Sequence, residues 1–293
     1  MAGRRGVQLS CDPVAAGRTL ECLRHQQNSK NPWAGVFIGG GGLLHRNFDP
    51  FWEEIVKLQI PLILFGIGIN CIPGQREETA DGTMQRIAAA ADFVHVRDRY
   101  TKSRLQEANG RLDICEGLCP SVNFLISRTA RIPQSGSHLF HVMHPTDLRM
   151  AGIDSEQLRR NLRTLANQMG LVYEEATHMS GCTNSLLKKY ARAGLVVSSR
   201  LHGCIFSFAM GKPWIAIGCD QKVRHFTESH CPEAHVLGRD DLINDGLTLE
   251  LANSIRNGSI CYEQVFRAAE KNVETMRAIK RAFPDLDGRT KSS

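Results

Sequence analysis

Short apolar runs alternate with amphipathic segments along most of the chain. Runs of β-branched and other apolar residues predict strands at 35–38, 61–69, 92–96, 112–115, 138–143, 171–173, 195–197 and 214–217. Apolar residues at helical spacing predict helices at 49–58, 77–91, 100–108, 155–169, 184–192 and 203–210. Such alternation is typical of parallel sheets with helices on both faces, so the sequence predicts an α/β protein.

The two ends of the chain extend this pattern. The N-terminal part predicts a strand, a helix and a turn at 7–11, 13–27 and 28–32. Near the other end, 262–283 predicts a long helix that packs across domains through Phe266, Ala269, Val273, Met276 and Phe283. The tail from Asp285 is expected to be disordered.

A polar stretch at 127–137, SRTARIPQSGS, separates two strand–helix series and predicts a linker. A chain of 293 residues also suits two domains better than one. We therefore predict two Rossmann-like domains facing a cleft, over 1–130 and 131–260, followed by a C-terminal helix and tail at 261–293.

Composition narrows the function classes. The net charge of +6 is spread along the chain without a basic tract, so nucleic-acid binding has little support and an anionic small substrate fits as well. There is no apolar run of about 20 residues and no secretion signal, which predicts a cytoplasmic protein. The ten cysteines are expected to be reduced thiols, because many lie in apolar segments.

The stretch at 193–219 carries the clearest candidate chemistry. Its apolar strand stops at Ser198 and Ser199, and Arg200-Leu201-His202 follows before the next helix. Carboxyl ends of strands bind ligands in open α/β sheets, and helix N-termini favour anions. A charged group among so many apolar residues needs a partner or a ligand, although a solvated loop is the simpler alternative.

Other strand ends are predicted to meet at one edge of the first sheet. These are the glycine run at 39–42, Asn70 and Arg97. Gly39, Gly40 and Gly41 suit a close ligand contact or a tight turn, and they lack the spacing of a dinucleotide fingerprint. Lys222, in a basic cluster at 222–225, is either a second anion contact or part of a solvated loop, and we favour the loop.

A metal site is not predicted. His138, His141 and His144 lie three residues apart, but such residues point to opposite faces of a strand, and no acidic ligand completes a set. The pair Cys115 and Cys119 also lacks a second pair at zinc-binding spacing.

Several motifs together resemble the polysaccharide pyruvyl transferase family. They are GVFIGGGGLL, V-R-D at Val96, a C-P-S turn, S-S-R-L-H-G and G-K-P, over roughly 35–226. The resemblance implies a GT-B-like fold and transfer of a pyruvyl group from phosphoenolpyruvate to a sugar of an exopolysaccharide or glycan precursor. It implies no cofactor and no metal. The acceptor carbohydrate, free or lipid-linked, stays open, as do a ketal or enol-ether product and the oligomeric state.

The resemblance also implies roles for particular residues. Arg200 and His202 would bind phosphoenolpyruvate, with His202 transferring protons, and Arg97 would be a second anion-binding arginine. The remaining substrate contacts would be Leu201, Gly39, Gly40, Gly41, Asn70 and Lys222. Residues 1–34 lack the G-N-x-G-D turn usual in the family, so the first βα unit is expected to be absent or diverged.

Two other functions remain open at this point. A nucleotide-sugar glycosyltransferase of GT-B type would usually place an acidic residue near its donor site, and none occurs within 198–219. A non-catalytic binding protein could instead retain the fold, in which case it would bind a ligand without turnover.

Overall fold

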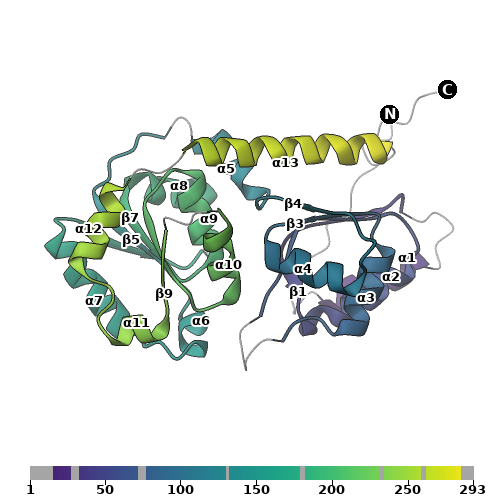
Figure 1. The fold of residues 1–293 in the computed structure, drawn as a ribbon, viewed down its shortest axis with the longest axis horizontal. Coiled ribbons are helices and arrows are strands. Elements are labelled where there is room, and N and C mark those ends of the chain that lie inside the picture. The colour runs from purple at the N-terminus through teal and green to yellow at the C-terminus, as the bar shows by residue number, and fades with distance from the viewer. Residues whose placement is uncertain are drawn as a thin grey trace. The chain divides into compact units, whose positions relative to one another are not determined.

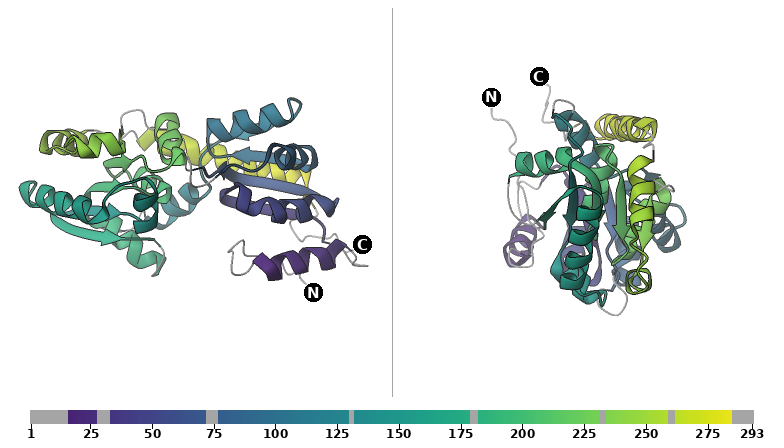
Figure 2. Two further views of the ribbon diagram at one scale, coloured as in Figure 1. Left: turned by 90° about the horizontal axis from the view of Figure 1, so that it is seen from below. Right: turned by 90° about the vertical axis from the view of Figure 1, so that its left-hand side faces the viewer.

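The computed structural model describes residues 16–27, 33–71, 77–129, 132–178, 182–230, 234–258 and 262–284. Contacts within the chain define two compact units (Figure 1 and, in two further views, Figure 2). Unit 1 comprises residues 1–70, 76–118 and 270–293, and unit 2 comprises 71–75 and 119–269. The predicted strand at 7–11, turn at 28–32 and tail from 285 lie outside the described residues.

Unit 1 contains a parallel sheet of four described strands in the order β1-β2-β3-β4. The strands are β1 (Val36–Leu44), β2 (Leu62–Ile69), β3 (Phe93–Val96) and β4 (Ile114–Glu116). Between and before them lie α1 (Ala16–Gln27), η1 (Arg46–Phe48), α2 (Asp49–Lys57), α3 (Asp81–Ala90) and α4 (Arg99–Ala108). Every residue of β2 is buried, as its unbroken apolar sequence predicts for a central parallel strand.

Unit 2 contains a parallel sheet of five described strands in the order β6-β5-β7-β8-β9. The strands are β5 (His138–Val142), β6 (Val172–Ala176), β7 (Ala193–Ser198), β8 (Trp214–Ile217) and β9 (His235–Leu237). The strand order reverses between β5 and β7, and ligands bind at such a switch point in doubly wound sheets. The switch point therefore lies beside the turn that follows β7.

Helices cover both faces of the unit 2 sheet (Figure 1). On one face, α7 (Ser155–Gln168) and α12 (Leu249–Asn257) pack on a core that includes Leu139, Leu195 and Ile215. On the other lie α8 (Thr183–Arg192), α9 (Leu201–Ala209) and α10 (Gln221–His230). The remaining helices are α5 (Ser121–Thr129), α6 (Pro145–Met150), α11 (Arg239–Ile243) and α13 (Tyr262–Ala282).

The glycine run does not end its strand, contrary to prediction. β1 continues through it to Leu44, with Gly40 and Gly41 at φ of 61° and 103° and a shift of register between Gly41 and Leu44. These positive φ values are open to glycine at little cost, so the strand absorbs the irregularity and resumes pairing with β2.

Two further predictions about local structure were wrong. The segment at 222–225 lies in α10 rather than in a loop, because Val223, Phe226 and Thr227 form a buried stripe on that helix. The start of the predicted linker, 127–129, lies in α5, where Val122 and Leu125 are buried. The division between the units falls after Leu118, compared with the boundary predicted at 130.

Helix α13 buries only part of the face that was predicted, since Met276 and Phe283 pack on the core of unit 1. Phe266 and Val273 are exposed, while Val265, Asn272 and Ile279 are buried. In unit 1, Ile279 packs on Ile63 and Phe65 of β2. The helix also divides between the units, since residues up to Ala269 group with unit 2 and the later ones with unit 1.

Candidate active site

The turn that follows β7 is held by one serine hydroxyl. Ser198 Oγ accepts a hydrogen bond from the Arg200 amide at 3.1 Å and donates one to the Arg200 carbonyl at 2.9 Å. A Cβ at Gly203 would overlap this hydroxyl and lie 2.8 Å from Ser198 Cβ. The serine and glycine of S-S-R-L-H-G therefore have a steric reason for their spacing, because Gly203, in the first turn of α9, lies against the Ser198 side chain.

The motif's three central residues have different environments. Arg200 is the N-cap of α9 and is half-buried, with no capping bond from its side chain. Leu201 is buried in unit 2, whereas His202 is exposed. Ser199 is 2% exposed, and its Oγ has no hydrogen-bond partner among the described residues. The strand end thus combines a cation, an imidazole and a buried hydroxyl.

A second histidine, His178, was not predicted to belong here. It follows β6 in the left-handed region at φ of 61°, which is unusual for a residue other than glycine. Its Nε2 lies 2.9 Å from Tyr190 Oη, and its ring packs against Phe206 of α9. Burial, then the nearby Arg200 and His202, lowers the pKa of His178 to about 3. The imidazole is therefore neutral near pH 7.

Lys222 forms an ion pair with a residue of the same unit, Asp220. Its Nζ lies 2.6 Å from Asp220 Oδ2, and its amide donates to Asp220 Oδ1 at 3.0 Å. Asp220 is 4% exposed and directly precedes α10. A ligand that approaches Lys222 thus meets an ion pair and not an isolated ammonium group.

The lysine of G-K-P has a structural role. Lys212 is 6% exposed and donates to the carbonyls of Ala191 and Ala193, both at 3.0 Å. Burial lowers its pKa to about 8. Lys212 therefore joins the end of α8 to the start of β7, just after Gly211 turns the chain at φ of 60°.

In unit 1, the residues that directly follow β2 and β3 each pack on a glycine of the neighbouring strand. Arg97 is 2% exposed and lies across Gly68, where an added Cβ would be 2.8 Å from the guanidinium carbon. Its Nε is 3.7 Å from Asp98, which caps α4. Asn70 lies across Gly42 in the same manner. The glycines at these two contacts make room for Arg97 and Asn70.

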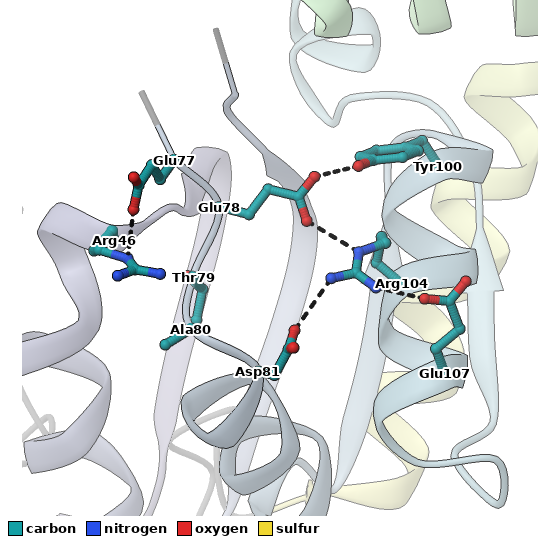
Figure 3. Close-up of a pocket in the computed structure, with 9 residues that line it drawn as sticks. All are labelled: Arg46, Glu77, Glu78, Thr79, Ala80, Asp81, Tyr100, Arg104 and Glu107. Carbon is teal, nitrogen blue, oxygen red and sulfur yellow. Dashed lines mark hydrogen bonds and ion pairs between the residues drawn. The ribbon is translucent and has the colours of Figure 1, made fainter. Parts of the chain in front are cut away.

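Figure 3 shows a pocket of about 670 Å³ in unit 1, which the sequence did not reveal. It is lined by Arg46, Glu77, Glu78, Thr79, Ala80, Asp81, Tyr100, Arg104 and Glu107. Residues 77–80 were predicted to be helical, but α3 begins only at Asp81. Charged residues at helical spacing usually indicate a solvated surface, which is why no pocket was predicted.

The described residues contain no group of three or more metal-ligating side chains that could hold an ion. Two of the histidines spaced three residues apart contact other side chains: His141 Nδ1 lies 2.9 Å from Tyr173 Oη, and His138 Nδ1 lies 2.9 Å from Ser137 Oγ. Within the same residues, no helix has the length and apolar character needed to cross a membrane.

Two solved structures share this fold across nearly the whole chain. One is assigned as a UDP-N-acetylglucosamine 2-epimerase from Listeria monocytogenes, with a TM-score of 0.55 and 12% identity over 97% of this chain and 83% of that one. The other is also a UDP-N-acetylglucosamine 2-epimerase, with a TM-score of 0.53 and 13% sequence identity. The match covers 100% of this chain and 82% of that one. These similarities confirm the predicted GT-B-like fold of two Rossmann-like domains.

Sequence comparison identifies the family. No curated protein sequence matches the chain significantly. The family model for polysaccharide pyruvyl transferase matches residues 18–175 and 183–221, about two thirds of the chain. The matched residues include β1 with its glycines, Arg97, and the turn from Ser198 to Gly203. The chain therefore belongs to the polysaccharide pyruvyl transferase family and is a transferase.

Proposed function

We propose that this transferase moves a pyruvyl group from phosphoenolpyruvate to a sugar of a polysaccharide or glycan precursor, with the donor bound at the turn after β7. The observation that carries the proposal is the turn itself, where the buried, unpartnered hydroxyl of Ser199 is followed directly by half-buried Arg200 and, two residues later, by exposed His202. A guanidinium group suits carboxylate and phosphate oxygens, and phosphoenolpyruvate carries both.

The proposed chemistry balances without an oxidant or a metal. A proton is added to the methylene carbon of the enol, and a sugar hydroxyl attacks the adjacent carbon. The bond to phosphate then breaks, and a second hydroxyl closes a ketal ring. The two hydroxyl protons offset the one on the new methyl group and the one that leaves with phosphate. His202 transfers protons, and Arg200 stabilises the donor's negative charge.

Further residues have supporting roles in this proposal. Neutral His178 places no additional cation beside Arg200 and helps to fix α9 through Tyr190 and Phe206. Arg97, Asn70 and the glycines Gly39 to Gly41 serve the acceptor side in unit 1. Lys222 contributes through its ion pair with Asp220.

Thermal unfolding with and without phosphoenolpyruvate tests the donor site. Ligand binding to the native state alone stabilises it by about 2.7 kcal/mol at a hundredfold excess over Kd. The midpoint should rise for the wild type and for Arg192→Ala, an exposed arginine of α8. The rise should vanish for Arg200→Ala. No rise in the wild type under a large excess of phosphoenolpyruvate would refute the donor site.

The same experiment addresses the second candidate, a nucleotide-sugar transferase. Asp220 is an acidic side chain three residues after the end of β8, and it directly follows the stretch 198–219, which has no acidic residue. It is already bound by Lys222 and an α10 amide, which disfavours a contact with ribose. Stabilisation by UDP-N-acetylglucosamine but not by phosphoenolpyruvate would favour this candidate.

A further inference from the structure

The pocket of unit 1 has an excess of negative charge. Four carboxylates line it, from Glu77, Glu78, Asp81 and Glu107, against the two guanidinium groups of Arg46 and Arg104, which leaves a net charge of −2. We propose that this pocket binds the hydroxyl groups of the acceptor sugar and selects uncharged and amino sugars over anionic ones. This inference rests on the proposed function.

The side chains of the pocket hold one another in place (Figure 3). Tyr100, Arg104 and Glu107 share one face of α4, because they are four and three residues apart. Arg104 binds Glu78 at 3.0 Å and Asp81 at 3.2 Å, and it also contacts Glu107. Tyr100 Oη donates to Glu78. This network fixes three carboxylates before a ligand arrives, which lowers the cost of binding.

The opposite wall also presents polar groups. Arg46 Nε lies 3.0 Å from Glu77, and the Arg46 amide donates to the Glu77 carbonyl. Thr79, which lines the pocket, is 2% exposed, and its Oγ1 has no hydrogen-bond partner among the described residues. A buried hydroxyl without a partner is costly, and a ligand hydroxyl would supply one.

The charge of the pocket defines the class of ligand. Carboxylate oxygens accept several hydrogen bonds each, so they retain acceptor capacity for sugar hydroxyls after binding Arg104. A phosphate or uronate group would meet repulsion from the net negative charge, whereas an ammonium group would be attracted. The volume of about 670 Å³ lies within the range of roughly 300–1,000 Å³ for small-molecule sites.

A binding experiment with sugars of matched shape tests the selection. Ligand-observed NMR at low salt would compare glucosamine, the methyl glycosides of glucose, galactose and mannose, and glucose 6-phosphate. We expect the amino sugar and at least one neutral glycoside to bind more tightly than the phosphate, by about tenfold or more. Equal or tighter binding of glucose 6-phosphate would overturn the proposal.

Charge reversal locates the binding. Asp81 is 84% exposed, so Asp81→Lys should fold, and it should weaken glucosamine binding by about tenfold while improving binding of the phosphate. Asp113→Lys makes the same charge change at an exposed residue of unit 1 that does not line the pocket. It should leave the affinities for glucosamine and for glucose 6-phosphate unchanged. Glu107→Gln removes one negative charge instead of reversing it. It should therefore weaken glucosamine binding and improve binding of the phosphate by smaller amounts than Asp81→Lys.

The outcome is separable from that of the donor site. If phosphoenolpyruvate raises the midpoint but no sugar binds, or if Asp113→Lys acts as Asp81→Lys does, the pocket proposal fails while the proposed function stands. If phosphoenolpyruvate has no effect, the proposed function fails, and the order of sugar affinities still shows whether the pocket selects by charge.

Discussion

Ser198 and Gly203 share one space at the start of α9: the serine hydroxyl that holds the turn occupies the position of a side chain at residue 203. We expect Gly203→Ala to destabilise unit 2 by about 1–3 kcal/mol, since the hydroxyl or the helix must move. It should also weaken phosphoenolpyruvate binding, because Arg200 moves with the turn. Urea unfolding and the thermal shift described above measure both effects.

The double variant Ser198→Ala/Gly203→Ala provides the control for this clash. Removing the hydroxyl eliminates the shortest contact, so the loss of stability from Gly203→Ala should be smaller in that background. Equal losses in the two backgrounds would show that the shared space is not the cause.

His202→Ala should nearly abolish pyruvyl transfer while leaving the fold intact. The side chain is exposed, so its removal costs little packing, whereas the proposed reaction loses its proton-transfer group. Release of phosphate from phosphoenolpyruvate in the presence of acceptor measures activity, and circular dichroism monitors the fold. His235→Ala, at another exposed histidine of unit 2, is the matched control. Full activity in His202→Ala would exclude the proposed role.

His178 should make unit 2 sensitive to acid. Its pKa is about 3 in the folded chain and about 6.5 when unfolded, so between these values the unfolded chain binds the proton and the native one does not. Neutral His178 therefore contributes fully to the free energy of unfolding above about pH 6.5. Below that pH the contribution falls by up to about 1.4 kcal/mol per pH unit. Hydrogen exchange of peptides from β5 and β7 would record the loss.

The variant His178→Asn isolates this contribution, because asparagine tolerates the left-handed conformation and does not titrate. From pH 6.5 to 4.5 the wild type should lose about 2–3 kcal/mol more than the variant. Parallel losses in the two proteins would contradict the buried, neutral state of His178.

Lys212→Met should destabilise unit 2 by about 1–3 kcal/mol, because two buried carbonyls lose their donor. The difference in free energy of unfolding between the wild type and Lys212→Met should increase as the pH rises above about 8. The folded pKa of Lys212 is about 8 against 10.5 unfolded, so between these values the unfolded chain holds more protons and wild-type stability rises with pH. Urea unfolding at pH 7 and about pH 9 tests this, and a constant difference would contradict it.

The sequence was most informative where a strand ends abruptly. The apolar run before Ser198 and Ser199 located β7, the turn and α9 to within two residues, and with them Arg200 and His202. It was less informative where polar residues are buried. Asn272 is 2% exposed in α13, and apolar spacing alone does not predict a buried asparagine. Met276 and Phe283 pack on the core as predicted, whereas the predicted Phe266 and Val273 are exposed and their neighbours Val265 and Asn272 are buried.

The sequence also did not predict the sites whose residues come from several different helices and loops. His178 reaches Tyr190 and Phe206 through tertiary contacts that no local pattern encodes. The unit 1 pocket combines residues from η1, the segment before α3, and α4, each of which has the polarity of a solvated surface. Spacing along one element predicts its buried face, but it does not predict which polar side chains of different elements meet.

The division of α13 between the units affects the order in which the chain can fold during synthesis. Residues of unit 2 are complete at Ala269, but the core of unit 1 needs Ile279, which packs on Ile63 and Phe65 and is made more than 200 residues after them. Domains usually fold as they emerge from the ribosome, beginning with the N-terminal one, but we expect unit 1 to complete its core only after Ile279 has been made. Unit 1, most of which is translated before unit 2, is thus completed after it.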